Sequence, residues 1–277
     1  MAEPKILIPI MAMAEAKPFE ALETNGIEKA LTQCLEAGYS PLFMPQVVDG
    51  RIFASPTDYI AQHWFTTPSV RVTGRSRGGN AVVVYAHVPN PFSNPANIKI
   101  AREAGLVNGA GKIPLQDFYN LLELEDGQRV YVVDHKTLQS SESGVIEVSK
   151  AMKHPQTIPF LGGQDRAEKY LAKHEEFYGD TIGIWHSDDL GDVPQGRPLF
   201  VGYGCNFGLV GDYLDGSGRV LGVVAAEPPH KGVVREAPRE NGNQTLDAKV
   251  LADLSAGKAF MYGGRLYAPV SAENLKL

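Results

Sequence analysis

The sequence predicts an α/β protein with a mainly parallel mixed sheet, flanking helices, peripheral hairpins and a C-terminal helix and hairpin extension. Two observations lead to this prediction. Three apolar segments of strand character run into a histidine, at His87, His135 and His186. From about residue 80 onward, strand-like and helix-like segments alternate, and this rhythm is typical of parallel strands joined by right-handed crossovers.

Length and composition indicate an ordinary globular chain. It has 277 residues, of which 43% are hydrophobic and 21% charged, and a chain of this size buries a large core. We therefore expect residues 1–277 to form a single α/β domain, with residues 228–277 as a small appended part.

Charge and patterning exclude several partners. The net charge of -6 argues against nucleic acid, because proteins that neutralise phosphates usually carry a basic excess. No segment approaches the roughly 18–20 apolar residues that cross a bilayer, and the first residues do not resemble an export signal. Cys34 and Cys205 are too few for a disulfide framework. We expect a cytoplasmic protein with no membrane partner.

The N-terminal part shows a strand, a helix and two hairpins. Residues 5–10 have strand character, and apolar residues at helical spacing predict a helix over 26–37, which Gly38 ends. Asp49-Gly50 is a strong turn signal, so we expect a hairpin that joins 42–48 to 51–53. A second hairpin joins 69–73 to 81–87.

The central part gives the alternation. Strands are expected at 81–87, 129–134, 157–160 and 181–186, and helices at 95–104, 115–122, 143–152 and 165–178.

The C-terminal part changes in character. We expect strands at 198–203 and 219–226, an exposed loop at 227–244, a helix at 246–256, and a hairpin that turns at Gly263-Gly264.

Histidines and carboxylates provide the first candidate site. Parallel strands would gather the three histidines at one sheet edge, where open α/β folds place their ligands. The catalytic candidates are His186, Asp188, Asp189 and His135, because imidazole and carboxylate groups exchange protons near neutral pH. The metal-ligand candidates are His87, His135, His186 and Asp192, which would suit zinc or manganese. A solvated acidic turn beside a hydrogen-bonded histidine is the simpler explanation.

A glycine-rich arginine loop provides the second candidate site. Arg71, Arg75, Arg77 and Asn80 surround it, and guanidinium groups bind carboxylate or phosphate in a bidentate manner. The predicted ligand is a small anionic molecule. The same residues also fit an ordinary hairpin turn.

A third pattern imitates a dinucleotide fingerprint. Gly204, Gly208 and Gly211 precede a strand that leads to Glu227. The spacing is off by one residue, so glycines in a closely packed strand pair explain the pattern better.

These patterns lead to one favoured function and two alternatives. The favoured interpretation is a hydrolase acting on a small anionic substrate, with water activated by a bound metal. The first alternative is a non-catalytic protein that binds an anion or a partner, and the second is an NAD(P)-dependent oxidoreductase. A homo-oligomer is compatible with each.

Overall fold

The computed structural model describes residues 6–8, 14–187, 189–205, 208–224, 260–262 and 265–267. The chain divides into two compact units, Met1–Ile10 with Ala14–Ala225, and Met11–Met13 with Ala226–Leu277. In the second unit, β13 (Phe260–Tyr262) pairs antiparallel with β14 (Arg265–Tyr267), whereas the helix expected at 246–256 lies outside the described residues. The first unit contains the described helices and the strands β1 to β12.

A four-stranded sheet joins the beginning and the end of this unit. Its strands lie in the order β1 (Ile6–Ile8), β2 (Ala14–Ala21), β12 (Gly218–Val224) and β3 (Tyr39–Pro41). All three neighbouring pairs are antiparallel. Because β2 and β12 pair directly, the long chain between them closes into a loop.

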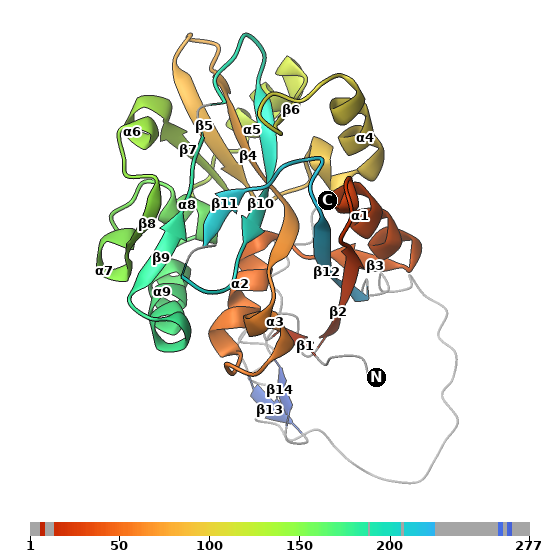
Figure 1. The fold of residues 1–277 in the computed structure, drawn as a ribbon, viewed down its shortest axis with the longest axis vertical. Helices are drawn as coiled ribbons and strands as arrows, with labels where there is room; N and C mark the ends of the chain where they lie inside the picture. Colours follow the sequence, from red (N-terminus) through yellow and green to blue (C-terminus); the bar gives the residue numbers. More distant parts are fainter. Residues whose placement is uncertain are drawn as a thin grey trace. The chain divides into compact units, whose positions relative to one another are not determined.

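A second sheet of eight strands forms the centre of the unit (Figure 1). Its order is β7 (Val130–Asp134), β5 (Ala81–Ala86), β4 (Phe65–Arg75), β10 (Gln195–Val201), β11 (Leu209–Gly211), β9 (Thr181–Ile184) and β8 (Gly144–Glu147), and β6 (Gly111–Lys112) also pairs with β10.

The expected mainly parallel sheet is wrong. Among the described strands, the single pair β11–β9 is parallel and every other neighbouring pair is antiparallel. Alternating strands and helices indicate which segments form, but they do not fix strand direction. The connection from β5 to β7 contains helices, yet β7 runs antiparallel to β5.

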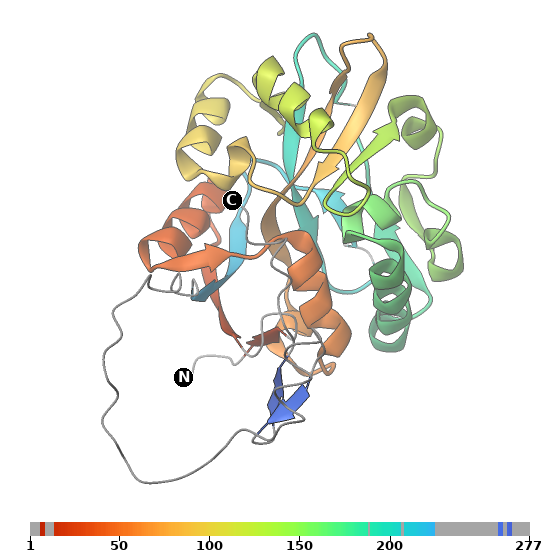
Figure 2. The same cartoon turned by 180° about the vertical axis from the view of Figure 1, so that it is seen from behind.

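Most of the helices that cover the sheet are short. They are α1 (Gly26–Glu36), α2 (Met44–Phe53), α3 (Tyr59–Gln62), η2 (Pro91–Ser93, a 3-10 helix), α4 (Pro95–Glu103), α5 (Leu115–Glu123), α6 (His135–Gln139), α7 (Val148–Ala151), α8 (Thr157–Leu161) and α9 (Gln164–Tyr178). Within the described residues, none of these helices has the length and apolar character to cross a membrane. Helices α2 and α9 lie behind the central strands in Figure 1 and in front of them in Figure 2.

Two segments expected to be strands are helices. Helix α2 replaces the hairpin expected around Asp49-Gly50. Gln46 accepts a hydrogen bond from the backbone N–H of Phe43 at 2.9 Å, which caps the first turn, and Asp49 is ion-paired with Arg166 at 2.7 Å. A turn signal in the sequence is therefore overridden by a cap and a tertiary ion pair. The segment 157–160 likewise forms α8.

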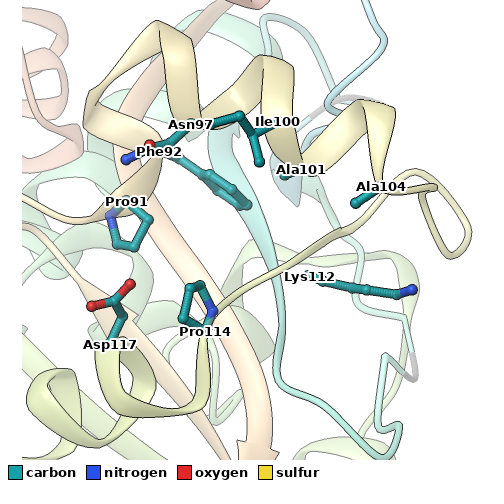
Figure 3. Close-up of a pocket in the computed structure, with 9 residues that line it drawn as sticks. All are labelled: Pro91, Phe92, Asn97, Ile100, Ala101, Ala104, Lys112, Pro114 and Asp117. Carbon is teal, nitrogen blue, oxygen red and sulfur yellow. The ribbon is translucent and has the colours of Figure 1, made fainter.

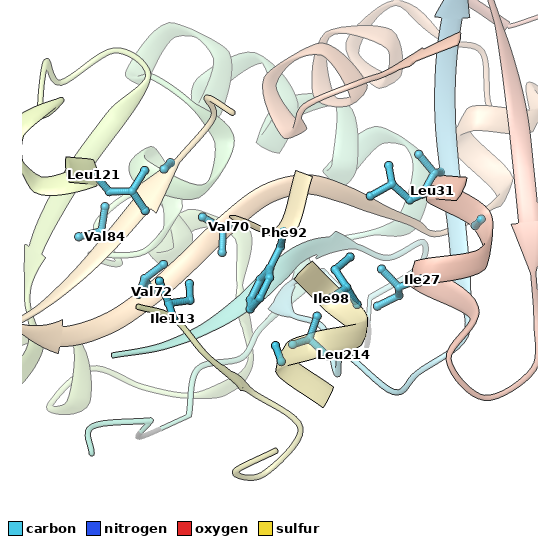
Figure 4. Packing of buried hydrophobic residues seen from close by; sticks show 14 of the residues in the cluster. Ile27, Leu31, Val70, Val72, Val84, Phe92, Ile98, Ile113, Leu121 and Leu214 are labelled. Carbon is cyan, nitrogen blue, oxygen red and sulfur yellow. The ribbon is translucent and has the colours of Figure 1, made fainter. Parts of the chain in front are cut away.

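One apolar core lies between β4, β5 and the helices α1, α4 and α5. Val70, Val72 and Val84 from the sheet contact side chains from the helices and their connections, among them Phe92, Ile98 and Leu121 (Figure 4). The alternation of β4 thus directs every second residue into this core.

A close backbone approach between α1 and β12 yields the first prediction. A Cβ on Gly26 would overlap the carbonyl oxygen of Ala21 and lie 2.5 Å from the backbone nitrogen of Gly218. We expect Gly26→Ala to lower the free energy of unfolding by about 2–3 kcal/mol, since backbone atoms cannot move aside as side chains do. Urea denaturation measures the change. Gly78→Ala is the control, because the nearest atom to its Cβ would lie 3.9 Å away, and an equal loss in both variants would contradict the explanation.

Candidate ligand-binding groove

The three histidines expected to form one site do not gather at one sheet edge. Strand β5 runs antiparallel to β7, with Ala86 opposite Val130 and Val82 opposite Asp134. His87 therefore follows β5 at one end of this pair, whereas His135 begins α6 at the other end. The composite site depended on parallel strands and does not form.

His87 is a hydrogen-bonded core residue. Its Nδ1 lies 3.0 Å from the Ser69 hydroxyl, and its Nε2 lies 2.9 Å from the carbonyl oxygen of Pro159. Ser69 in turn accepts the backbone N–H of Met44 at 2.8 Å, so its hydroxyl donates to Nδ1. Burial lowers the pKa of His87 to about 4. Both ring nitrogens are occupied, which leaves neither for a metal.

His186 belongs to a different cluster. Its Nε2 lies 3.3 Å from the Ser141 hydroxyl, which lies 3.0 Å from Nε2 of His154. Burial lowers the pKa of His186, and the charges of His154, Arg71 and His135 lower it further. Among the residues with described positions, no group of three or more His, Cys, Asp or Glu side chains could hold a metal ion.

Asp189 is the centre of a buried ion network. It accepts Arg71 Nη1 at 2.7 Å and Arg197 Nε and Nη2, each at 3.0 Å. Arg71 and Arg197 are opposite each other in the β4–β10 ladder. Burial raises the pKa of Asp189, but hydrogen bonds from Arg197 and the charges of both arginines outweigh it, so the pKa lies below its usual range. These contacts are those of a structural counter-ion.

The remaining predicted residues are dispersed. Arg75 and Arg77 are exposed where the β4–β5 hairpin turns; Arg75 donates to the Gly79 carbonyl at 3.4 Å, and Arg77 pairs with Glu123 at 2.9 Å. Asn80 is exposed on the same turn and Asp192 on the loop before β10, while Asp188 lies outside the described residues. Buried Arg71 therefore does not converge with the other members of the proposed anion loop.

An apolar groove that the sequence analysis did not predict lies over the strands β8, β9, β10 and β11, and is called the groove over β8–β11. It has a volume of about 510 Å³ and is lined by Val145, Trp185, Phe200, Val210, Gly211, Asp212 and Tyr213. Trp185, Val145 and Tyr213 are 40%, 42% and 57% exposed. Neighbouring exposed apolar side chains are typical of binding surfaces. Trp185 stands beside His186 in the sequence, and no short motif marks it as a binding residue.

The ladder explains why these side chains lie together. Thr66 on β4 is opposite Phe200 on β10, and Phe200 is opposite Val210 on β11. Cross-strand neighbours share one face of a sheet, and Asp212 follows Val210 by two residues. Trp64, two residues before Thr66, stacks on Phe200 with ring centroids 5.5 Å apart.

Asp212 places an acidic group in the groove. Its Oδ2 accepts the Thr66 hydroxyl at 2.5 Å, and its Oδ1 accepts the Tyr213 backbone N–H at 2.9 Å. Burial raises the pKa of Asp212 to about 6, although both hydrogen bonds oppose the shift.

A second hollow is smaller. It lies beside α4 and has a volume of about 170 Å³; Ile100 and Phe92 line it together with Lys112 and Asp117 (Figure 3). Its walls are mostly aliphatic and proline side chains. The groove over β8–β11 is larger and carries aromatic rings and a carboxylate, so it is the better candidate for a binding site.

The ion network yields the second prediction. Asp189→Asn should lower the free energy of unfolding by about 3–5 kcal/mol, because it leaves two buried guanidinium groups without their counter-ion. Asp192→Asn, on the same loop but exposed, should change it by less than about 0.5 kcal/mol. Chemical denaturation distinguishes the two. If the two variants were equally stable, Asp189 would not have the assigned role.

Buried histidines yield the third prediction. Burial lowers the pKa values of His87 and His174 to about 4, whereas histidines in the unfolded chain titrate near 6.5. Between these values the unfolded state binds more protons, so stability is present above pH 6.5 and falls as pH drops toward 4, by on the order of 2 kcal/mol per histidine. His87→Gln should reduce the slope of unfolding free energy against pH in this window. An unchanged slope would contradict this account.

Comparison with known proteins places the fold. No family model and no curated protein matches the chain. A solved structure, described as the accommodation of massive sequence variation in Nanoarchaeota by the C-type lectin fold, matches it with 47% identity and a TM-score of 0.71. The match covers 76% of this chain and 98% of that chain.

This match corrects the sequence-based predictions. It contradicts the α/β class with a mainly parallel sheet, the metal-dependent hydrolase and the NAD(P)-dependent oxidoreductase, and it favours the alternative of a non-catalytic binding protein. Antiparallel strands, with β2 and β12 paired, agree with that fold assignment. The chain belongs to the family of C-type lectin fold proteins that the nanoarchaeal structure represents.

Proposed function

We propose that this protein binds a ligand without catalysis, through the groove over β8–β11. The observation that carries the proposal is the exposure of Trp185, Tyr213 and Val145 side by side on the sheet. Exposed aromatic rings supply a large contact area at a low cost in conformational entropy, and they dominate the energetics of many interfaces.

The side chains that hold Tyr213 and Phe200 in place also favour a binding function. Arg197, held by Asp189, places its guanidinium carbon 5.1 Å from the ring centroid of Tyr213. Phe200 is held from the other side by its stack on Trp64. Side chains held in place before binding lose little freedom when a ligand arrives, which raises affinity.

The nanoarchaeal relative suggests how the groove could serve many ligands. That structure concerns massive sequence variation accommodated by the C-type lectin fold. We propose that variation here is tolerated at the exposed groove positions, because side chains that point away from the core can change without loss of packing. Ligand specificity would then depend on these positions, while the fold depends on the core and on Asp189.

Two expectations from the sequence remain proposals. A cytoplasmic location agrees with a sequence that has two cysteines, too few for a disulfide framework. A small anionic ligand could still contact Arg75 and Arg77, but Arg71 could not join them because it is bound to Asp189.

The fourth prediction tests the groove. The purified protein is screened against peptide and glycan arrays, and any ligand found is titrated against Trp185→Ala and Tyr213→Ala. Each variant should weaken binding about tenfold or more, with a melting temperature within a few degrees of the original. Phe53→Ala is the matched control, since Phe53 is 69% exposed and does not line the groove. If Phe53→Ala weakened binding as much as the groove variants, or if neither groove variant weakened it, the groove would not be the site.

A further inference from the structure

We infer that the groove over β8–β11 binds an organic cation, a lysine ammonium or arginine guanidinium group of a peptide, against Asp212 and the rings of Trp185 and Tyr213. This inference rests on the proposed function and names the ligand chemistry of the same groove. It depends on the hydrogen bonds of Asp212, on the charges around it, and on a similar arrangement elsewhere in this molecule.

Asp212 retains acceptor capacity. Its two donors among the described residues, the Thr66 hydroxyl at 2.5 Å and the Tyr213 backbone N–H at 2.9 Å, are both neutral. A carboxylate offers about four lone-pair positions, so these donors occupy about half of them. Within the described ranges of the chain, Asp212 makes no ion pair. A positively charged donor in the groove would therefore meet an acidic group whose charge is not directly neutralised.

The described charged groups near Asp212 do not pair with it directly, so a bound cation could. The charge of Arg197 acts on Asp212, but the Arg197 guanidinium donates to both oxygens of Asp189 and to the carbonyl of Asn108. Asp215 adds negative charge. Arg197 lowers the pKa of Asp212 and Asp215 raises it, yet burial outweighs both and brings the pKa to about 6. At neutral pH the group is thus a poorly solvated carboxylate, a state that a bound cation stabilises.

Elsewhere in the molecule, a carboxylate and an aromatic ring already hold a guanidinium group. Arg219 donates to Glu20 at 2.7 Å while its guanidinium carbon lies 4.6 Å from the ring centroid of Trp64. A carboxylate and an aromatic face together hold that guanidinium, as is common for cation–π contacts. In the groove, Asp212 stands beside Trp185 and Tyr213. Arg197 already lies against the ring of Tyr213 but is ion-paired with Asp189, so the cation that pairs with Asp212 would be supplied by a partner.

A titration followed by NMR tests the inference. The chain has two tryptophans, so Trp185→Phe identifies the indole N–H signal of Trp185. The probes are N-acetyl-lysine methylamide, N-acetyl-arginine methylamide and, as the uncharged match, N-acetyl-norleucine methylamide. At pH 7.5 the charged probes should bind at least about tenfold more tightly than the norleucine probe. This preference should disappear as pH falls through about 6, because Asp212 becomes protonated.

Variants separate the charge from the shape of the groove. Asp212→Asn should abolish the preference for charged probes, while Asp192→Asn, which removes an exposed carboxylate outside the groove, should retain it. The pH dependence of the unmodified protein gives the same information without a variant, in case Asp212→Asn unfolds.

The outcomes distinguish the inference from the proposed function. Equal affinity for charged and uncharged probes, or an undiminished preference in Asp212→Asn, overturns the cation inference and leaves binding at the groove intact. Tighter binding of neutral glycans than of charged probes, with a shift of the Trp185 signal, also overturns it. If array ligands bind without any shift of the Trp185 signal, the groove is not the site and both proposals fail.

Discussion

The ion network of Arg71, Asp189 and Arg197 is the interaction on which the centre of this structure depends. One carboxylate receives two guanidinium groups that stand opposite each other on β4 and β10. Buried charges cost free energy unless they are paired and hydrogen-bonded. Here Arg71 Nη2 also donates to the backbone carbonyl of Ser187 and Arg197 Nη2 to that of Asn108, while Arg71 Nε is buried without a partner among the described residues. The network therefore ties the loop after β9 to the middle of the sheet.

This constraint links stability to the proposed binding groove without placing the ion network in the groove itself. The loop that Asp189 anchors follows Trp185, and Arg197 lies against the ring of Tyr213. The groove thus has exposed side chains in contact with a buried ion network. An arrangement of this kind allows the exposed positions to change while the supporting charges stay, which agrees with a fold described as accommodating massive sequence variation.

Much of the secondary structure could be predicted from the sequence, because it depends on local spacing. Helices α1 and α9 follow from apolar residues at helical intervals, and β5 and β7 follow from runs of valine. The helix α2 could not, since the Asp49–Arg166 ion pair that supports it joins residues far apart in the chain. Strand direction was also beyond local patterns, and the wrong direction produced the histidine site.

The groove, like the strand directions, could not be predicted from local sequence patterns. Thr66, Phe200 and Asp212 come together through the register of three strands, and no short motif marks that register. The sequence does contain its signal in Trp185 and Tyr213, large aromatic residues in segments rich in glycine and aspartate. Their exposure on the sheet, which decides their role, becomes visible in the folded chain.

A saturation library that covers the groove and the ion network tests the central claim most directly. Each variant is displayed on a cell surface and scored separately for folding and for binding of a ligand from the arrays. The account predicts that Val145, Trp185 and Tyr213 tolerate most substitutions for folding while controlling binding, and that Arg71, Asp189 and Arg197 tolerate almost none for folding. Groove positions as intolerant as Asp189 in the folding score, or indifferent in the binding score, would contradict it.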